Sequence, residues 1–137
     1  MMKLLSIILT LISFNSFACQ CFHVSPEEAA KESKHVFLAR IYSVEDLAKL
    51  PNAKDTDTGV RAKIEIYETI KGKPQQFEFL YSGYGHGDCG LGFTVGDRYL
   101  FITSNDKVSI CGSHVKNFSP WSGEDKALYE KLKKANE

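Results

Sequence analysis

Residues 59–71, GVRAKIEIYETIK, decide the fold class of this 137-residue chain. From Val60 to Ile70 one set of alternate residues is apolar except for Glu68, and the other set is polar except for the aromatic Tyr67. A period of two is typical of a β-strand with one buried face and one exposed face. The stretch therefore predicts a mainly β protein.

The stretch before it, residues 35–44, predicts a second strand. Its two alternating sets are both largely apolar: Val36, Leu38, Tyr42 and Val44 on one face, and Phe37, Ala39 and Ile41 on the other. A strand that is apolar on both faces is expected in the centre of its sheet.

Three shorter strands complete the predicted sheet. Residues 75–81 are expected to be a strand with Phe77, Phe79 and Tyr81 on one face. Residues 98–104 and 107–111 are expected to form a hairpin around a turn at Asn105-Asp106.

Two capped helices flank the strands. Ser25, Pro26 and Glu28 form the signature of a capping box, which predicts a helix from Pro26 to about Ser33. Ser122 predicts the cap of a second helix over about residues 122–135. We expect Trp121 to pack in the core against that helix.

Two long connections carry little regular pattern. Residues 45–58 predict an exposed connection with a helical turn at 45–50, and connections of this length are often binding elements. Residues 82–92 are rich in glycine, but a phosphate-binding loop would lead into a helix. We therefore expect a flexible loop, pinned at Cys89.

The first 18 residues predict a secretory signal peptide, with one early lysine, an apolar run and small residues before Cys19. The apolar run is too short to cross a bilayer, which needs about 20 residues. Residues 19–137 are then a single exported domain, secreted or periplasmic. The alternative is a lipoprotein anchored through an acylated Cys19, which would leave an odd number of cysteines.

The charge balance excludes one class of partner. The chain carries 17 basic and 17 acidic residues, and no basic run interleaves with aromatic residues. This composition argues against nucleic-acid binding. We expect a monomer without stable membrane insertion.

The four cysteines predict disulfides, because exported domains of this size commonly contain them. Cys19 and Cys21 are too close in sequence to bond each other comfortably. Two schemes linking them to Cys89 and Cys111 remain, and spacing does not choose between them. Each would close a long loop, which removes about 4 kcal/mol of unfolded-chain entropy.

Five strands with a capped helix at each end predict a five-stranded closed barrel of the OB type. An ordered set of motifs also runs along the chain: Cys19-Gln20-Cys21, 35–41, 70–72, Cys89-Gly90 with Phe93, 96–100, Cys111 and Pro120-Trp121. This set resembles the netrin-like module, and most closely the amino-terminal domain of the tissue inhibitors of metalloproteinases in a short bacterial-type form.

The resemblance implies a disulfide scheme and a function. It implies the bonds Cys19–Cys89 and Cys21–Cys111, and it implies a protein that inhibits a zinc metalloproteinase and is not an enzyme. The free amine and carbonyl oxygen of Cys19 would ligate the protease zinc. Gln20 would enter the specificity pocket, Cys21 would brace the terminus, and Phe22 would contact the protease. No cofactor of its own is implied.

Two alternatives remain open from the sequence. The first is a netrin-like extracellular interaction module without inhibitory activity. The second is a Cys/His metal-binding protein, because three histidines (His23, His86 and His114) lie near Cys21, Cys89 and Cys111 in the sequence. A metal site of this kind needs reduced thiols, whereas export favours disulfides.

Overall fold

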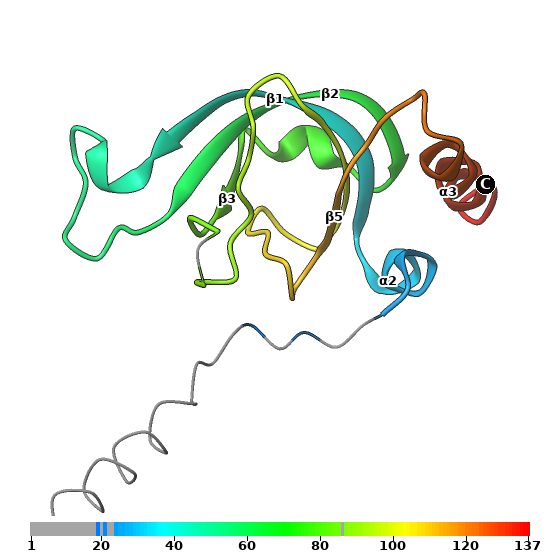
Figure 1. Ribbon diagram of the computed structural model, residues 1–137, viewed down its shortest axis with the longest axis horizontal. Helices are drawn as coiled ribbons and strands as arrows, with labels where there is room; N and C mark the ends of the chain where they lie inside the picture. Colours follow the sequence, from blue (N-terminus) through cyan, green and yellow to red (C-terminus); the bar gives the residue numbers. More distant parts are fainter. Residues whose placement is uncertain (1–18, 20, 22–23, 86) are drawn as a thin grey trace, which may run out of the picture.

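The computed structural model describes residues 19, 21, 24–85 and 87–137, and it contains one five-stranded antiparallel sheet with two α-helices (Figure 1). The strand order is β3-β2-β1-β4-β5. The elements in chain order are α2 (Pro26–Glu32), β1 (His35–Asp46), the 3-10 turn Leu47–Lys49, β2 (Val60–Lys71), the 3-10 turn Pro74–Gln76, β3 (Phe79–Ser82), β4 (Arg98–Thr103), β5 (His114–Asn117) and α3 (Gly123–Lys134).

The prediction that residues 35–44 form a central strand is confirmed. β1 pairs with β2 on one side and with β4 on the other, and its residues contribute to both hydrophobic clusters. The inner cluster comprises Phe37, Ala39, Ile41, Ala62, Leu80, Tyr99, Phe101 and Val108. The outer cluster comprises Ala30, Val36, Leu38, Leu100, Ile102 and Leu132. Burial of each large apolar side chain contributes roughly 1.5–3 kcal/mol.

The outer cluster covers only one end of the sheet. α2 supplies Ala30 and α3 supplies Leu132, and both side chains are almost fully buried against β1 and β4. In Figure 1 both helices lie at the same end of the sheet, while the β1–β2 connection projects from the opposite end. The rest of this outer face carries no helix.

Bulges in β1 and β2 change which residues face the inner cluster. Ile41 pairs with Ile64 and Ser43 pairs with Lys63, so Tyr42 is an extra residue. Because an inserted residue reverses the alternation, Val44 packs against the inner cluster, and our assignment of Val44 to the face of Val36 was wrong.

Two bulges also change which residues of β2 face the inner cluster. Tyr67 and Ile70 are the residues without a partner of their own in the register with β1. Beyond Tyr67 the alternation of side chains between the two faces is reversed. Ile70 therefore packs against the outer cluster, whereas Ile64 and Ile66 pack against the inner cluster.

Two of the shorter strands differ from the prediction. Residues 74–76 form a 3-10 turn, and β3 begins only at Phe79 with Leu80 as its fully buried residue. The partner of β4 is β5, residues 114–117, and not 107–111. The segment 107–111 instead belongs to the connection that carries Cys111, where its backbone bonds to β3 and to the Cys89 loop.

The sheet is open between its edge strands β3 and β5. An isolated parallel bridge joins β3 to the β4–β5 connection: Tyr81 N donates to Asp106 O and Val108 N donates to Tyr81 O, each at 2.8 Å. These two bonds cover the free edge of β3, and exposed edges are otherwise prone to pair with other chains.

Both helices begin where the sequence predicts. The hydroxyl of Ser25 accepts from the amide of Glu28, and the Glu28 carboxylate accepts from the amide of Ser25, which completes the capping box. The hydroxyl of Ser122 accepts from the amide of Asp125 at the start of α3. Hydrogen-bonded caps of this kind each stabilise a helix by about 1 kcal/mol.

The prediction for Trp121 was wrong, because this side chain is 93% exposed. It stands on a turn in which Ser122 N donates to Ser119 O. The turn is held by Asp125, whose carboxylate accepts from Ser119 N and pairs with Lys116, 2.5 Å away. Leu132, Leu128 and Tyr129 pack on the outer cluster from α3 in its place.

Among the described residues, no helix has both the length and the apolar character needed to cross a bilayer.

His35 gives the fold a pH dependence. Its ring is buried, Nδ1 accepts from the amide of Lys73 at 3.1 Å, and the ring packs edge-on against Phe77. Burial, with a smaller effect of the nearby Lys34 charge, lowers the pKa of His35 below its ordinary value. The folded protein therefore holds a neutral imidazole, because protonation would place two donors against each other.

We expect the free energy of unfolding to fall between about pH 7 and pH 5, because the unfolded chain takes up a proton that folded His35 resists. The stabilisation is complete above the unfolded pKa and is lost as the pH falls through the folded pKa. Urea unfolding of the wild type and of His35→Gln across this range measures the effect. The variant should lose less stability on acidification than the wild type, and parallel pH profiles would contradict the prediction.

Candidate functional site

Two disulfides tie the first described residues to loops that are distant in sequence. Cys19 bonds to Cys89 and Cys21 bonds to Cys111, with sequence separations of 70 and 90 residues. This is the pairing that the netrin-like resemblance implies, and spacing alone could not have chosen it. Closing loops of this length stabilises a protein by about 4 kcal/mol in the simple entropic treatment, and less for the second bond.

The two loops that hold the cysteines are also bonded to each other. The amide of Ile110, next to Cys111, donates to the carbonyl oxygen of Cys89 at 3.0 Å. The bridge between Tyr81 and Val108 lies a few residues away on the same two segments. Cys19 and Cys21 are therefore anchored on two loops that are hydrogen-bonded to each other, which restricts their backbone relative to the sheet.

The glycine-rich loop before Cys89 is organised by the carboxylate of Asp88. This carboxylate accepts from the amides of Tyr84, Gly85 and Gly90 at 2.5, 2.9 and 2.9 Å. These hydrogen bonds, led by the one from Gly85, lower the pKa of Asp88. The loop thus uses its amides to bind an internal anion, which explains why a glycine-rich segment here need not bind phosphate.

Two glycines of this loop, Gly83 and Gly90, have no room for a side chain. At Gly90 an added Cβ would lie 2.2 Å from the carbonyl carbon of Gly83, and at Gly83 it would lie 2.5 Å from the Asp88 carboxylate. Cys89 itself has φ 58°, an uncommon value for a residue with a side chain. The loop therefore sets the direction from which Cys89 reaches Cys19.

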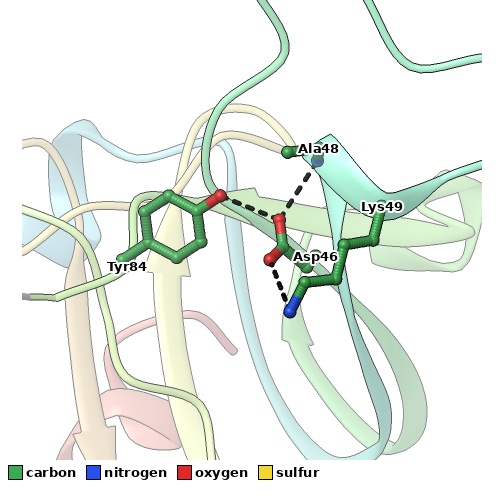
Figure 2. A network of polar contacts seen from close by, with 4 residues as sticks. All are labelled: Asp46, Ala48, Lys49 and Tyr84. Carbon is green, nitrogen blue, oxygen red and sulfur yellow. Dashed lines mark hydrogen bonds and ion pairs between the residues drawn. The ribbon is translucent and has the colours of Figure 1, made fainter.

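A tyrosine joins the same loop to the end of β1. The hydroxyl of Tyr84 donates to Asp46 at 2.8 Å, as Figure 2 shows, and the same carboxylate accepts from the amide of Ala48 and pairs with Lys49. The bond from Tyr84 is the main cause that lowers the pKa of Asp46, and it raises the pKa of Tyr84. The acceptor of the Asp46–Tyr84 hydrogen bond is therefore an ionised carboxylate, and a charged acceptor strengthens a hydrogen bond.

The Cys111 loop has its own internal bonds. The buried hydroxyl of Ser113 accepts from the amide of Ser109 and donates to the carbonyl of Ser109, each at 3.0 Å. The hydroxyl of Ser109 in turn accepts from the amide of Gly112 at 2.8 Å. These bonds close a tight turn that presents Cys111 at the surface.

Two open cavities border the disulfide-bonded loops. The first, of about 320 Å³, lies between α2 and the Cys111 loop, with Val24 and His114 in its lining. The second, of about 450 Å³, lies between the Gly-rich loop and the β1–β2 connection, with Asp57, Asp88 and Lys107 in its lining. Both are open hollows at the surface, and the first includes Cys111 itself in its lining.

Some of the remaining predicted site residues are not described by the structure, and the others bear on the Cys/His metal hypothesis. Gln20, Phe22, His23 and His86 lie outside the described residues. All four cysteines are in disulfides, so none supplies a thiolate, and within the described part of the chain no three His, Cys, Asp or Glu side chains form a cluster that could hold a metal ion. The Cys/His metal hypothesis therefore gains no support, and His114 lines a cavity without such partners.

Sequence reasoning missed the residues that organise the site. Asp88, Tyr84 and Asp46 are polar residues in or beside irregular segments, and no local pattern marks which backbone amides they bind. The one available signal was an aspartate placed among five glycines between residues 83 and 92, because short carboxylates bind loop amides.

The chain was also compared with known proteins. No family model matches it, and no curated protein matches it.

Asp88→Asn tests the role of the carboxylate in the loop. An amide keeps one acceptor oxygen but turns a donor toward the remaining amides, so we expect hydrogen exchange at Tyr84, Gly85 and Gly90 to accelerate by about tenfold. Asp55→Asn is the control, because that side chain is exposed and makes none of these bonds. Equal exchange in the wild type and the Asp88 variant would contradict the assignment.

The lowered pKa of Asp88 also predicts that the free energy of unfolding falls in acid. Because the pKa of Asp88 is lowered in the folded state, its stabilisation is present above the unfolded pKa near 3.9 and is lost as the pH falls through the folded pKa. In Asp88→Asn this component of the acid transition should be absent.

Proposed function

We propose that the protein is an exported inhibitor of zinc metalloproteinases that acts through the amino terminus at Cys19. The observation that carries this proposal is the double anchoring of Cys19 and Cys21, by two disulfides, on two loops that are hydrogen-bonded to each other. A terminus held in this way binds with little loss of conformational entropy, because its backbone is ordered before the partner arrives.

The proposed mechanism begins with removal of the leader before Cys19. The new α-amine, with an ordinary pKa near 8, loses its proton readily when it approaches Zn²⁺. The amine nitrogen and the carbonyl oxygen of Cys19 then occupy the open coordination positions of the protease zinc and displace the water that the enzyme needs. The bonds to Cys89 and Cys111 would keep both ligand atoms in place.

The fold that accompanies this function is proposed to be a netrin-like OB-type barrel. The supporting observations are the inner cluster enclosed by β1, β2, β3 and β4, and the parallel bridge of Tyr81 with Lys107 at the open side. Closure of the barrel would take place along this bridge, where the edge of β3 meets the β4–β5 connection.

Two disulfides suggest a non-cytoplasmic location, since thiols in the cytoplasm are kept reduced. We infer secretion or export to the periplasm from the leader-like residues 1–18 together with these bonds.

A second candidate function is an extracellular interaction module without inhibitory activity. Trp121 favours it: the side chain is 93% exposed, yet its turn is held by bonds from Ser119 and Ser122 and by the Asp125–Lys116 pair. Rigid exposed tryptophans are frequent anchors in protein interfaces. This function would survive a blocked amino terminus, whereas inhibition through Cys19 would not.

The decisive experiment compares a form that begins at Cys19 with a form that carries one extra alanine before it. Both are assayed against a panel of zinc endopeptidases with a fluorogenic peptide substrate. The extension moves the amine away from the zinc and adds bulk there, so we expect the inhibition constant to rise by about 100-fold or more.

An extra alanine after Glu137 is the matched control and should leave inhibition unchanged. Mass spectrometry without reductant verifies that each form starts where intended and keeps both disulfides. Equal inhibition by the two amino-terminal forms, or no inhibition of any protease in the panel, would overturn the proposal.

A further inference from the structure

The uncovered part of the outer sheet face carries an unusual set of side chains, which we call the outer patch: Arg40, Tyr42, Lys63, Glu65, Tyr67 and Arg98. They come from β1, β2 and β4, and all six are exposed. Arg40 lies opposite Glu65 on β2 and opposite Arg98 on β4, so the three strands bring these charges together.

Two bulges place the aromatic residues of the outer patch. Tyr42 and Tyr67 are both extra residues in the β1–β2 ladder, and they are 69% and 46% exposed. A bulge changes the direction of a side chain, and it leaves the extra residue unpaired and disrupts the hydrogen-bond ladder locally. Here each of the two bulges adds a ring to the face that the helices leave bare.

The cations of the outer patch lack acidic partners. Among the described residues, no carboxylate lies within 4.0 Å of the charged groups of Arg40, Lys63 or Arg98. The cations at the covered end of the same face differ, because Lys116 pairs with Asp125 at 2.5 Å and Lys133 pairs with Glu68 at 3.6 Å.

The cations contact rings and backbone instead. The guanidinium of Arg98 lies 5.7 Å from the ring centroid of Tyr67, and the ammonium of Lys63 lies 6.0 Å from that of Tyr42. Arg40 Nε donates to the carbonyl of Gly96 at 3.1 Å. These contacts hold the charged groups near the surface while leaving donors free for a ligand.

We propose that the outer patch binds an acidic polysaccharide. Its three cations match the carboxylates of a uronate chain, and its two exposed rings offer faces on which the C–H bonds of pyranose rings can pack. Glu65 fits the same ligand, because a carboxylate accepts hydrogen bonds from sugar hydroxyls.

The central Glu65 disfavours a nucleic acid in the same place. A DNA duplex carries about one negative charge per 1.7 Å of its axis, so phosphates would approach the glutamate closely. A uronate polymer carries at most one carboxylate per sugar ring and has hydroxyls between the charges. The balanced net charge of the chain agrees with a local site of this kind and not with a general polyanion binder.

The outer patch is independent of the proposed inhibition, since it contains neither the disulfides nor the loops that anchor Cys19. An inhibitor with a blocked amino terminus should therefore still bind the polysaccharide.

The test measures binding of the disulfide-bonded protein to polygalacturonate by isothermal titration calorimetry, with dextran and a single-stranded DNA oligonucleotide as comparison ligands. We expect binding to polygalacturonate that weakens as salt is added, and none to dextran. The double variant Lys63→Glu/Arg98→Glu should bind at least about tenfold more weakly. Tyr42→Ala should bind about threefold to tenfold more weakly at the same salt concentration.

The matched control is Lys54→Glu/Lys126→Glu, which makes the same change of charge at exposed positions outside the patch. It should bind like the wild type, and circular dichroism verifies the fold of every variant. Equal weakening by both double variants, an unchanged affinity in Tyr42→Ala, or tighter binding to DNA than to polygalacturonate would each overturn the proposal.

Discussion

Burial of β1 on both faces is the constraint on which the rest of the structure depends. Phe37, Ala39 and Ile41 need cover from β2, β3 and β4, while Val36 and Leu38 need cover on the opposite side. α2 and α3 supply that cover at one end only. The position of the helices and the uncovered end of the outer face follow from how much of this strand is apolar on that face.

The amino terminus adds a second layer of constraint that is covalent. Neither Cys19 nor Cys21 belongs to a helix or strand, and each is fixed by a bond to a loop far along the chain. A disulfide to a mobile loop would not fix the position of Cys19 or Cys21. The carboxylate of Asp88 and the hydroxyl of Ser113 remove that freedom by binding backbone amides that no sheet or helix uses.

The two proposed activities use different kinds of surface. The terminus at Cys19 offers two ligand atoms whose placement depends on crosslinks. The outer patch offers charge and ring faces whose placement depends on bulges in paired strands. One small domain can hold both, because the outer patch shares no residue with the loops that carry the disulfides.

The sequence by itself determined the elements whose signals are local. The period-two pattern of residues 59–71, the doubly apolar stretch 35–44 and the caps at Ser25 and Ser122 each specify structure through neighbours within a few residues. Only the tertiary structure decided the shift of β5 to residues 114–117 and the exposure of Trp121, and it has, of the two cysteine pairings that spacing leaves open, the one that the resemblance implies. These features depend on contacts between residues far apart in sequence. The hydrogen bonds of Tyr81 to residues 106 and 108 hold that segment away from β4. Asp125 holds the turn on which Trp121 points outward. Bulges such as Tyr42 and Tyr67 belong to the same group, because an extra residue shows only when the partner strand is in place.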